Sequence, residues 1–300
     1  MLAILLTLGA GWGLTQSLSK ISVSTGFGPF GLLFWQALIG AVLLGGIAVM
    51  RGARVPLTRE ALGLCILIAF LGTVIPNSIA YAAYRHLPQG VMSIIISTVP
   101  MIAFPVALAI RAERFNTVRF GGLVLGLIGI VMIASAPIGG TGGLDAATTG
   151  ATRLWVMIAL LGPLCYALEG NIIGKWGTAG LDPIVLMCGA SAVGAAIALP
   201  LAIGTGQWID PVRGYGAPEY ALVVSSVIHA LMYAGYVWLV GRAGAVFASQ
   251  TAYLVTGSGV LWAMLLLGER FPPLVWLALA VMFAGIFLVQ PRTVSETARA

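Results

Sequence analysis

Apolar runs of about twenty residues recur along the whole of this chain, and they restrict it to one class of fold. Each run is long enough to cross roughly 30 Å of hydrocarbon as an α-helix. Of the 300 residues, 60% are hydrophobic and only 8% are charged, whereas about a quarter of the residues in a soluble domain carry charge. The alternating pattern of a membrane β-barrel is absent. The sequence therefore predicts an all-α polytopic membrane protein.

Ten of these runs can be counted, and most of them are joined by short connections. The longer connection from Pro137 to Arg153 is rich in Gly, Thr and Ala, which predicts a flexible linker. Short connections make consecutive helices antiparallel neighbours. The membrane spans are expected at about residues 2–22, 29–50, 61–84, 90–110, 118–136, 154–174, 183–204, 219–240, 245–267 and 272–290.

The second part of the chain repeats the first. A shift of 156 positions lays Ala80–Ile130 over Tyr236–Ile286 and aligns identical residues at several points. The most distinctive identity is a Glu-Arg-Phe tripeptide, which starts at Glu113 and again at Glu269. The predicted organisation is a first five-helix repeat at 1–137, a linker at 138–153, a second five-helix repeat at 154–291 and a tail at 292–300.

Lys and Arg residues indicate the orientation, because cytoplasmic loops carry an excess of them. With the N-terminus inside, the cytoplasmic segments hold Arg51, Arg54, Arg59, Arg111, Arg114, Arg119, Lys175, Arg242, Arg292 and Arg299. The outer segments then hold only Lys20, Arg85, Arg153, Arg213 and Arg270. Both termini are therefore expected in the cytoplasm. The net charge of +6 is explained by these loop residues and does not indicate nucleic-acid binding.

An odd number of spans in each repeat has a topological consequence. The second set of five helices enters the membrane in the opposite direction, so the two repeats are inverted relative to each other. Inverted repeats are typical of secondary transporters, in which two similar halves exchange conformations around a site near the middle of the membrane. The sequence therefore predicts transport by alternating access, with a small-molecule substrate and the lipid bilayer as partners.

Several short motifs also point to a family. Trp12 and Gly13 are followed by Lys20 in the first span, and Glu-Arg corners recur at Glu113 and Glu269 within the ten-span duplication. This combination resembles the drug/metabolite transporter superfamily of the EamA type, and most of all its bacterial inner-membrane exporters of aromatic amino acids. The resemblance implies a central cavity surrounded by the first four spans of each half, with the fifth and tenth spans peripheral. It also implies efflux of small metabolites, often amino acids or organic cations.

Glu169 and His229 are ionisable residues well inside predicted spans, where such groups are costly and mark candidate sites. Glu169 shares a helix face with Tyr166, and His229 shares one with Tyr233. Glu169 could pair with a substrate amine or bind a proton, so proton coupling is possible. His229 could accept a proton or hydrogen-bond a ring or a carboxylate. The alternative for both residues is a structural hydrogen bond between helices.

Other polar and aromatic side chains occur at helical spacing in the remaining spans. They are Trp12, Gln16, Asn77, Tyr81, Tyr84, Ser97, Met101, Gln250 and Tyr253. Aromatic stripes of this kind are more often helix packing or an interfacial belt than a binding site. Here the aromatic residues share faces with polar groups, which predicts that they line a substrate-binding cavity together with the four residues of the previous paragraph. Such a lining would stack on aromatic rings and, with a carboxylate nearby, attract cations.

Proline and glycine residues suggest where the helices bend. Pro76 lies in the third span, Pro100 and Pro105 lie in the fourth, and a Gly-Ser run from Gly257 to Gly259 lies in the ninth. Proline frees a backbone carbonyl one turn earlier and bends a helix. We expect the third, fourth, eighth and ninth spans to form the gates, with hinges near these residues.

Motifs for catalysis are missing. The sequence has no Walker loop, no HExxH and no GxSxG, which argues against an enzyme and against any cofactor, metal or catalytic residue. The predicted function is export of small amphipathic metabolites, with aromatic or other neutral amino acids favoured, across a bacterial inner membrane. An organic-cation or drug exporter is the nearest alternative. An intramembrane enzyme and a passive channel are weaker ones.

Overall fold

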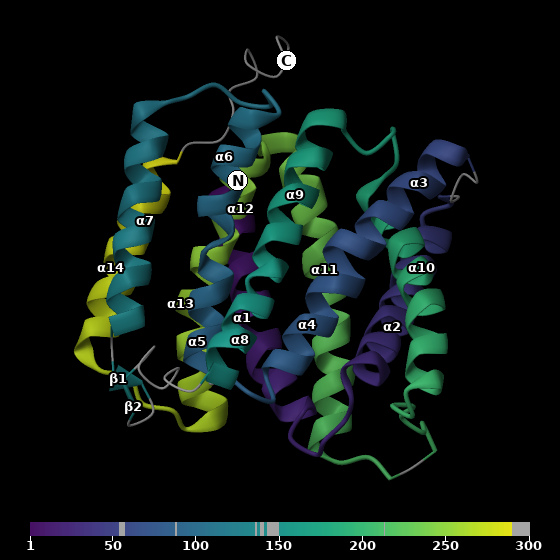
Figure 1. The fold of residues 1–300 in the computed structure, drawn as a ribbon. Coiled ribbons are helices and arrows are strands. Elements are labelled where there is room, and N and C mark those ends of the chain that lie inside the picture. Colours follow the sequence, from purple (N-terminus) through teal and green to yellow (C-terminus); the bar gives the residue numbers. More distant parts are fainter. Residues whose placement is uncertain are drawn as a thin grey trace.

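The computed structural model describes residues 1–53, 58–87, 89–135, 137–138, 141–142, 150–212 and 214–289. These residues form a bundle of long helices (Figure 1). In chain order the elements are α1 (Leu2–Ser22), α2 (Pro29–Met50), α3 (Arg59–Ile68), η1 (Ala69–Val74), α4 (Ile75–Ala83), α5 (Gln89–Ser97), α6 (Val99–Ala109), α7 (Thr117–Ser135), β1 (Pro137–Ile138), β2 (Thr141–Gly142), α8 (Gly150–Ala159), α9 (Leu161–Trp176), α10 (Pro183–Gly204), α11 (Ala217–Ala243), α12 (Ala245–Ser249), α13 (Thr251–Leu267) and α14 (Pro273–Leu288).

All ten predicted spans coincide with helix, within a few residues at each end. Eight helical segments of the described chain are long and apolar enough to cross a membrane. The other two, at Thr117–Ile133 and Pro273–Leu288, are apolar but shorter. Large apolar side chains also cover the outside of the bundle: Val42, Val49 and Leu265 are 68%, 77% and 74% exposed. The all-helical membrane class is therefore confirmed, apart from the two-residue strands β1 and β2, which pair with each other.

Local signals in the sequence explain where several helices begin. Proline at the first helical position has no N–H to leave unpaired, and α2 and α10 start in this way at Pro29 and Pro183. The side chain of Asp182 accepts a hydrogen bond from the backbone N–H of Ile184, which caps α10. Thr58 caps α3 through the backbone N–H of Ala61.

The third span changes from α-helix to π-helix at η1 and back to α-helix at α4. Pro76 has no backbone N–H, and its usual helical partner is the carbonyl of Gly72, which lies inside η1. The wider turn accommodates this missing hydrogen bond. Single π-helical turns of this kind occur frequently at functional sites.

The fourth span divides into α5 and α6 at Thr98, two residues before Pro100. Pro105, by contrast, lies inside the continuous helix α6. The ninth span also divides, but its break is at Gln250 between α12 and α13, and the run from Gly257 to Gly259 lies inside α13. These glycines allow close packing instead, because a Cβ at Gly257 would be 2.5 Å from Cζ of Phe283.

Helix packing pairs elements from the two parts of the chain. In the centre, α1 packs against α11 and α13, and α2 packs against α10. At one side of the bundle α7 and α14 form a separate pair, as the resemblance implied for the fifth and tenth spans (Figure 1). These two helices touch through Gly122 and Gly285, since a Cβ at either residue would lie within 2.6 Å of the other's carbonyl oxygen.

Some predictions fall on residues that the structure does not describe. Most of the linker at 138–153 and the whole tail at 292–300 lie outside the described residues. The same holds for four of the basic residues used for the orientation, namely Arg54, Arg213, Arg292 and Arg299.

Candidate functional site

A cavity of about 160 Å³ lies between α1, α2, α4, α5, α9, α11 and α13. It reaches from the middle of the bundle toward the end at which α1 and α4 terminate, because Ser19 and Tyr84 are part of its wall. Eight of the predicted site residues line it: Trp12, Gln16, Asn77, Tyr81, Tyr84, Tyr166, His229 and Tyr233. Helices far apart in the sequence therefore converge on one site.

One wall is held by a chain of hydrogen bonds across three helices. The hydroxyl of Tyr166 on α9 donates to Oδ1 of Asn77 on α4, at 3.0 Å. The amide Nδ2 of Asn77 donates in turn to Oε1 of Gln36 on α2, at 3.1 Å. Asn77 and Gln36 are buried, so each bond is made in a medium of low dielectric constant and orients its side chain firmly.

Another part of the wall is aromatic. Trp12 on α1 lies among three rings of α11, with its ring centroid 6.1 Å from His229, 6.0 Å from Tyr233 and 5.5 Å from Tyr236. The indole N–H of Trp12 also donates to Nδ1 of His229, at 3.3 Å. The tilted and edge-to-face arrangements are those that aromatic pairs prefer.

Glu169 lies directly behind this aromatic wall. Its side chain is fully buried, and the hydroxyl of Tyr233 lies 2.6 and 2.5 Å from its two carboxyl oxygens. Gly72 in η1 covers the pair from the other side. A Cβ at Gly72 would be 1.6 Å from the Tyr233 hydroxyl, so only glycine leaves room for this contact.

The first span is also tied to the fourth and ninth. The hydroxyl of Ser93 on α5 donates to Oε1 of Gln16, at 3.2 Å. Ser258 on α13 donates to the carbonyl oxygen of Gly9, at 2.7 Å, and Gly13 approaches the same Ser258 side chain closely. Hydrogen bonds between helices and glycine contacts of this kind replace the hydrophobic driving force that is missing inside a membrane.

Four predicted site residues, in addition to Glu169, do not line the cavity. Ser97 and Gln250 are fully buried and donate to carbonyls of their own helices, those of Ile94 and Val246. Met101 packs into the hydrophobic core.

Tyr253 is fully buried and points to α7, where its hydroxyl lies against Gly126. Sequence spacing placed this residue on a common face with Gln250, but the ring turns away from the cavity.

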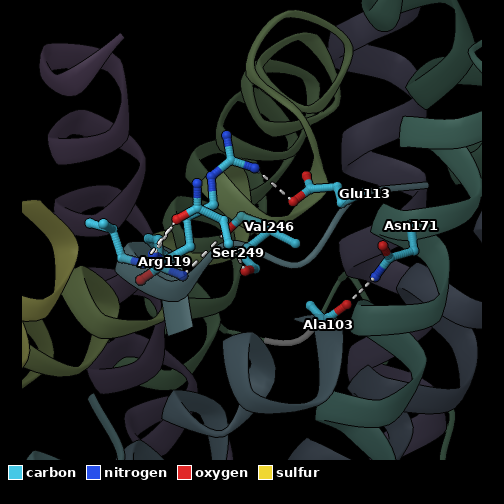
Figure 2. A network of polar contacts seen from close by, with 9 residues as sticks. Ala103, Glu113, Arg119, Asn171, Val246 and Ser249 are labelled. Atoms are coloured by element: carbon cyan, nitrogen blue, oxygen red, sulfur yellow. Dashed lines mark hydrogen bonds and ion pairs between the residues drawn. The ribbon is translucent and has the colours of Figure 1, made fainter. Parts of the chain in front are cut away.

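Polar contacts join helices near the end of the bundle where α6 terminates (Figure 2). Asn171 on α9 is fully buried and donates to the carbonyl oxygen of Ala103 on α6, at 3.0 Å. Lys175, one turn further along α9, donates to the carbonyl oxygen of Ile110. Nearby, Arg119 forms an ion pair with Glu113 of the first Glu-Arg corner, at 3.0 Å.

At the opposite end, Lys20 at the end of α1 donates to the carbonyl oxygens of Tyr84 and Leu87, at 2.8 and 3.4 Å. The second corner residue, Glu269, lies between α13 and α14 and interacts electrostatically with Lys20. Partial burial raises the pKa of Glu269 above its ordinary value, and the positive charge of Lys20 opposes this shift. The two Glu-Arg corners thus lie at opposite ends of the bundle.

Sequence reasoning missed some residues of the site. Gln36 is a polar side chain in an otherwise apolar span, so the rule that selected Glu169 would also have found it. Tyr236 lines the cavity and shares a helix face with His229 and Tyr233, a spacing that the sequence shows although Tyr236 was not among the predicted site residues. Gly72 carried no recognisable signal, because glycine is frequent throughout the chain.

The wall of the cavity is uncharged. Among the described residues, no Lys, Arg, Asp or Glu lines it, and no group of three or more His, Cys, Asp or Glu side chains is placed to hold a metal ion. Aromatic faces alternate with amide and hydroxyl groups. A site of this composition can hold a small molecule with one apolar part and a few hydrogen-bonding groups.

Known proteins resemble the chain over most of its length. A protein of Streptantibioticus cattleyicolor named a probable terminal-alkyne amino-acid exporter is 25% identical over 276 residues, which cover 90% of this chain and 87% of that protein. The uncharacterized transporter YvbV of Bacillus subtilis is 23% identical over an alignment that covers 96% of this chain and 91% of that protein. A solved crystal structure shares the fold, with a TM-score of 0.70 and 16% sequence identity. The match covers 95% of this chain and 94% of the chain in that structure.

The family model that matches is that of the EamA-like transporter family, at residues 1–135 and 153–290. The match covers both parts of the chain that the internal repeat defines. It confirms the resemblance drawn from the sequence motifs, and it identifies a multi-pass membrane transporter of small molecules rather than an enzyme. The chain belongs to the EamA-like transporter family.

Proposed function

We propose that this protein exports small amphipathic metabolites by alternating access, with aromatic and other neutral amino acids as the favoured substrates. The observation that carries this proposal is the central cavity, whose wall is aromatic and polar but uncharged and comes from both parts of the chain. A cavity of about 150 Å³ in another protein is large enough to bind benzene. The 160 Å³ observed here therefore suits a solute with a single ring or a side chain of similar size.

Helix packing supports two inverted five-helix repeats, at 1–137 and 154–291. In two such repeats, each span of the first corresponds to the span five places later in the second. The contact of α1 with α11 then corresponds to that of α9 with α4, and the contact of α1 with α13 corresponds to that of α9 with α6. The pairs α2 with α10 and α7 with α14 each join two corresponding spans, so each pair corresponds to itself. All of these contacts are present, as expected if the two shorter apolar helices complete a set of ten spans.

In the proposed orientation both termini lie in the cytoplasm of a bacterial cell and the protein lies in its inner membrane. The end that carries the contacts of Asn171 and Lys175 then faces the cytoplasm, and the cavity reaches toward the outer end of the bundle. Export also requires a second conformation, in which the cavity opens toward the cytoplasm instead. The interruptions at η1, Thr98 and Gln250 are where we expect the third, fourth and ninth spans to bend.

The named relative supports the substrate class. The protein of Streptantibioticus cattleyicolor carries the name of an amino-acid exporter, and it aligns with nearly the whole of this chain. At 25% identity the side chain that each transporter accepts is expected to differ.

Glu169 is the residue that we propose to take up a proton or a substrate cation. The titratable groups that interact with it are Cys165 and Tyr166 on α9, and Tyr233 and Tyr236 on α11, all uncharged partners. A buried carboxyl group that has no cationic partner among the described residues suits binding of a proton or an amine. This feature also favours the second candidate function, export of organic cations or drugs.

Reconstitution into liposomes tests the proposal. Uptake of labelled phenylalanine and tryptophan is measured against unlabelled competitors, with an organic cation in a parallel series. We expect saturable amino-acid flux with counterflow, which a passive channel would not show. Flux of the cation alone would assign the protein to the alternative function, and absence of both fluxes would contradict the proposal.

The variant Glu169→Gln separates the two roles of the carboxyl group. If Glu169 binds a proton, amino-acid transport persists in the variant but loses its dependence on pH. If Glu169 binds a substrate amine, cation transport is abolished. The variant Tyr233→Phe is the matched control, because it removes the hydrogen bond and keeps the carboxyl group.

A further inference from the structure

The hydrogen bond between Trp12 and His229 determines which imidazole nitrogen carries the proton. The indole Nε1–H of Trp12 can only donate, and it lies 3.3 Å from Nδ1 of His229. Nδ1 must therefore accept, which requires its lone pair. The proton of the imidazole is consequently on Nε2, which makes Nε2–H a hydrogen-bond donor.

This donor has no partner within the described part of the chain. Nε2 of His229 is buried and makes no hydrogen bond there. A buried donor without an acceptor is destabilising, and native proteins keep few of them, so each one calls for an explanation. His229 is also part of the cavity wall, where a bound molecule could supply the missing acceptor.

Several other donors around the cavity are already engaged. The hydroxyl of Tyr166 donates to Asn77, and the amide of Asn77 donates to Gln36. Lys20 uses its ammonium group at the end of the bundle, on the carbonyl oxygens of Tyr84 and Leu87. No Lys or Arg lines the described wall, so a negatively charged group that enters the cavity must be received by an uncharged donor. Nε2–H of His229 is such a donor, and it has no partner among the described residues.

We propose that Nε2–H of His229 hydrogen-bonds the carboxylate of the substrate. This inference rests on the proposed function, and it narrows the substrate class to compounds that carry a carboxylate next to an apolar group. The ring of such a compound lies against Trp12 and Tyr233, which flank His229 at centroid distances of 6.1 and 5.5 Å. His229 thereby distinguishes amino acids from amines that lack the carboxylate.

Three competitors isolate the contribution of the carboxylate. All three compounds share the ring and the amine. Phenylalanine also carries a carboxylate, phenylalaninamide carries an amide in its place, and 2-phenylethylamine carries neither group. The inhibition constant of each is measured against uptake of labelled phenylalanine into liposomes that contain the full chain. The variant His229→Phe keeps a ring and removes the donor, and His229→Gln restores a donor on a side chain without a ring.

In the wild type we expect phenylalanine to bind more tightly than 2-phenylethylamine. In His229→Phe the inhibition constant of phenylalanine should rise about 10- to 100-fold, the range for a lost hydrogen bond to a charged group, while that of 2-phenylethylamine changes little. His229→Gln should recover part of the preference. If His229→Phe does not fold, the double variant Trp12→Phe, His229→Phe replaces both partners and leaves neither unpaired.

Several results would overturn the inference. Equal weakening of phenylalanine and 2-phenylethylamine in a folded variant would show that His229 only shapes the cavity. Equal inhibition by phenylalanine and phenylalaninamide in the wild type would show that the charge of the carboxylate is not recognised. Both of these results leave amino-acid export intact, whereas absence of amino-acid flux in the wild type contradicts the proposed function and the inference together.

Discussion

A methyl group added at Gly72 would test the buried contact between Tyr233 and Glu169 directly. In Gly72→Ala the new Cβ would lie 1.6 Å from the Tyr233 hydroxyl, and 2.6 and 2.7 Å from the two carboxyl oxygens of Glu169. Real Cβ atoms essentially never come closer than 3.0 Å to a neighbour, so the hydroxyl must move away. Both side chains are buried, so this movement breaks their hydrogen bond or displaces the helices around them.

The expected loss of stability follows from two contributions. Breaking this hydrogen bond leaves a buried polar group unsatisfied, which costs about 1–3 kcal/mol, and overpacking a buried site costs about 1–3 kcal/mol. Replacing glycine by alanine in a helix offsets roughly 1 kcal/mol of this loss. The net destabilisation of Gly72→Ala is therefore about 1–5 kcal/mol. At about 2–4 °C for each kcal/mol, the melting temperature should fall by roughly 2–20 °C.

A double-mutant cycle makes the prediction specific. Tyr233→Phe removes the hydroxyl nearest to the new methyl group, so the double variant Gly72→Ala, Tyr233→Phe loses the hydrogen bond only once and avoids the worst overlap. The loss in the double variant should therefore be smaller than the sum of the single losses, by about 1–3 kcal/mol. Thermal unfolding of the purified protein in detergent measures all four proteins.

The control is Gly63→Ala in α3, earlier in the same span. A Cβ at Gly63 meets nothing within 4 Å, so this variant should match or exceed the wild type in stability. Additive losses in the double-mutant cycle would refute the reasoning, since they would mean that Gly72 and Tyr233 do not compete for the same space. An unchanged melting temperature for Gly72→Ala would refute it as well.

Three further predictions concern other parts of the molecule. Gly122→Ala should lower the melting temperature strongly, because its Cβ would lie 2.6 Å from a backbone carbonyl oxygen of α14, whereas the neighbouring Gly121→Ala meets nothing within 4 Å and should be tolerated; equal effects would contradict the packing of α7 on α14. Tyr253→Phe should be neutral or stabilising in thermal unfolding and leave transport unchanged, because it removes a buried hydroxyl without a partner among the described residues. A marked loss of transport would mean that Tyr253 takes part in substrate binding after all. Partial burial raises the pKa of Glu269, so the charged form is disfavoured in the native state and stability is lost as pH rises from the ordinary pKa through the raised one. Relative to Glu269→Gln, the melting temperature of the wild type should therefore increase on acidification through this pH window. A difference between the two proteins that stays constant with pH would argue against the burial.

Much of the fold could be predicted from the sequence. The positions of all the spans follow from the length of the apolar runs, because a membrane admits a helix only where the chain is apolar for long enough. The polar residues inside spans were also recognisable one at a time, because such groups are costly in hydrocarbon. Glu169 and His229 were singled out for this reason, and both make hydrogen bonds between helices in the fold.

The tertiary structure decided which side of each helix faces the cavity. Tyr253 and Ser97 satisfied the same spacing rule as Tyr81 and Asn77, yet they point into helix contacts. In a soluble protein the polar face of a helix marks the side turned to water. Here lipid is as apolar as the interior, so a packed face and a lipid-facing one have similar compositions.

The partner of each polar group was likewise decided only by folding. Gln36 meets Asn77, and Gly72 meets Tyr233, across helices that are distant in the sequence. Nε2 of His229, which has no partner among the described residues, carries the proton because Trp12, more than two hundred residues earlier, donates to the other nitrogen. The sequence by itself therefore determined where the long apolar helices lie and which polar residues within them are costly. Only the packing of the helices determined which of these residues form the site, because their contacts depend on three-dimensional fit rather than on spacing along one helix.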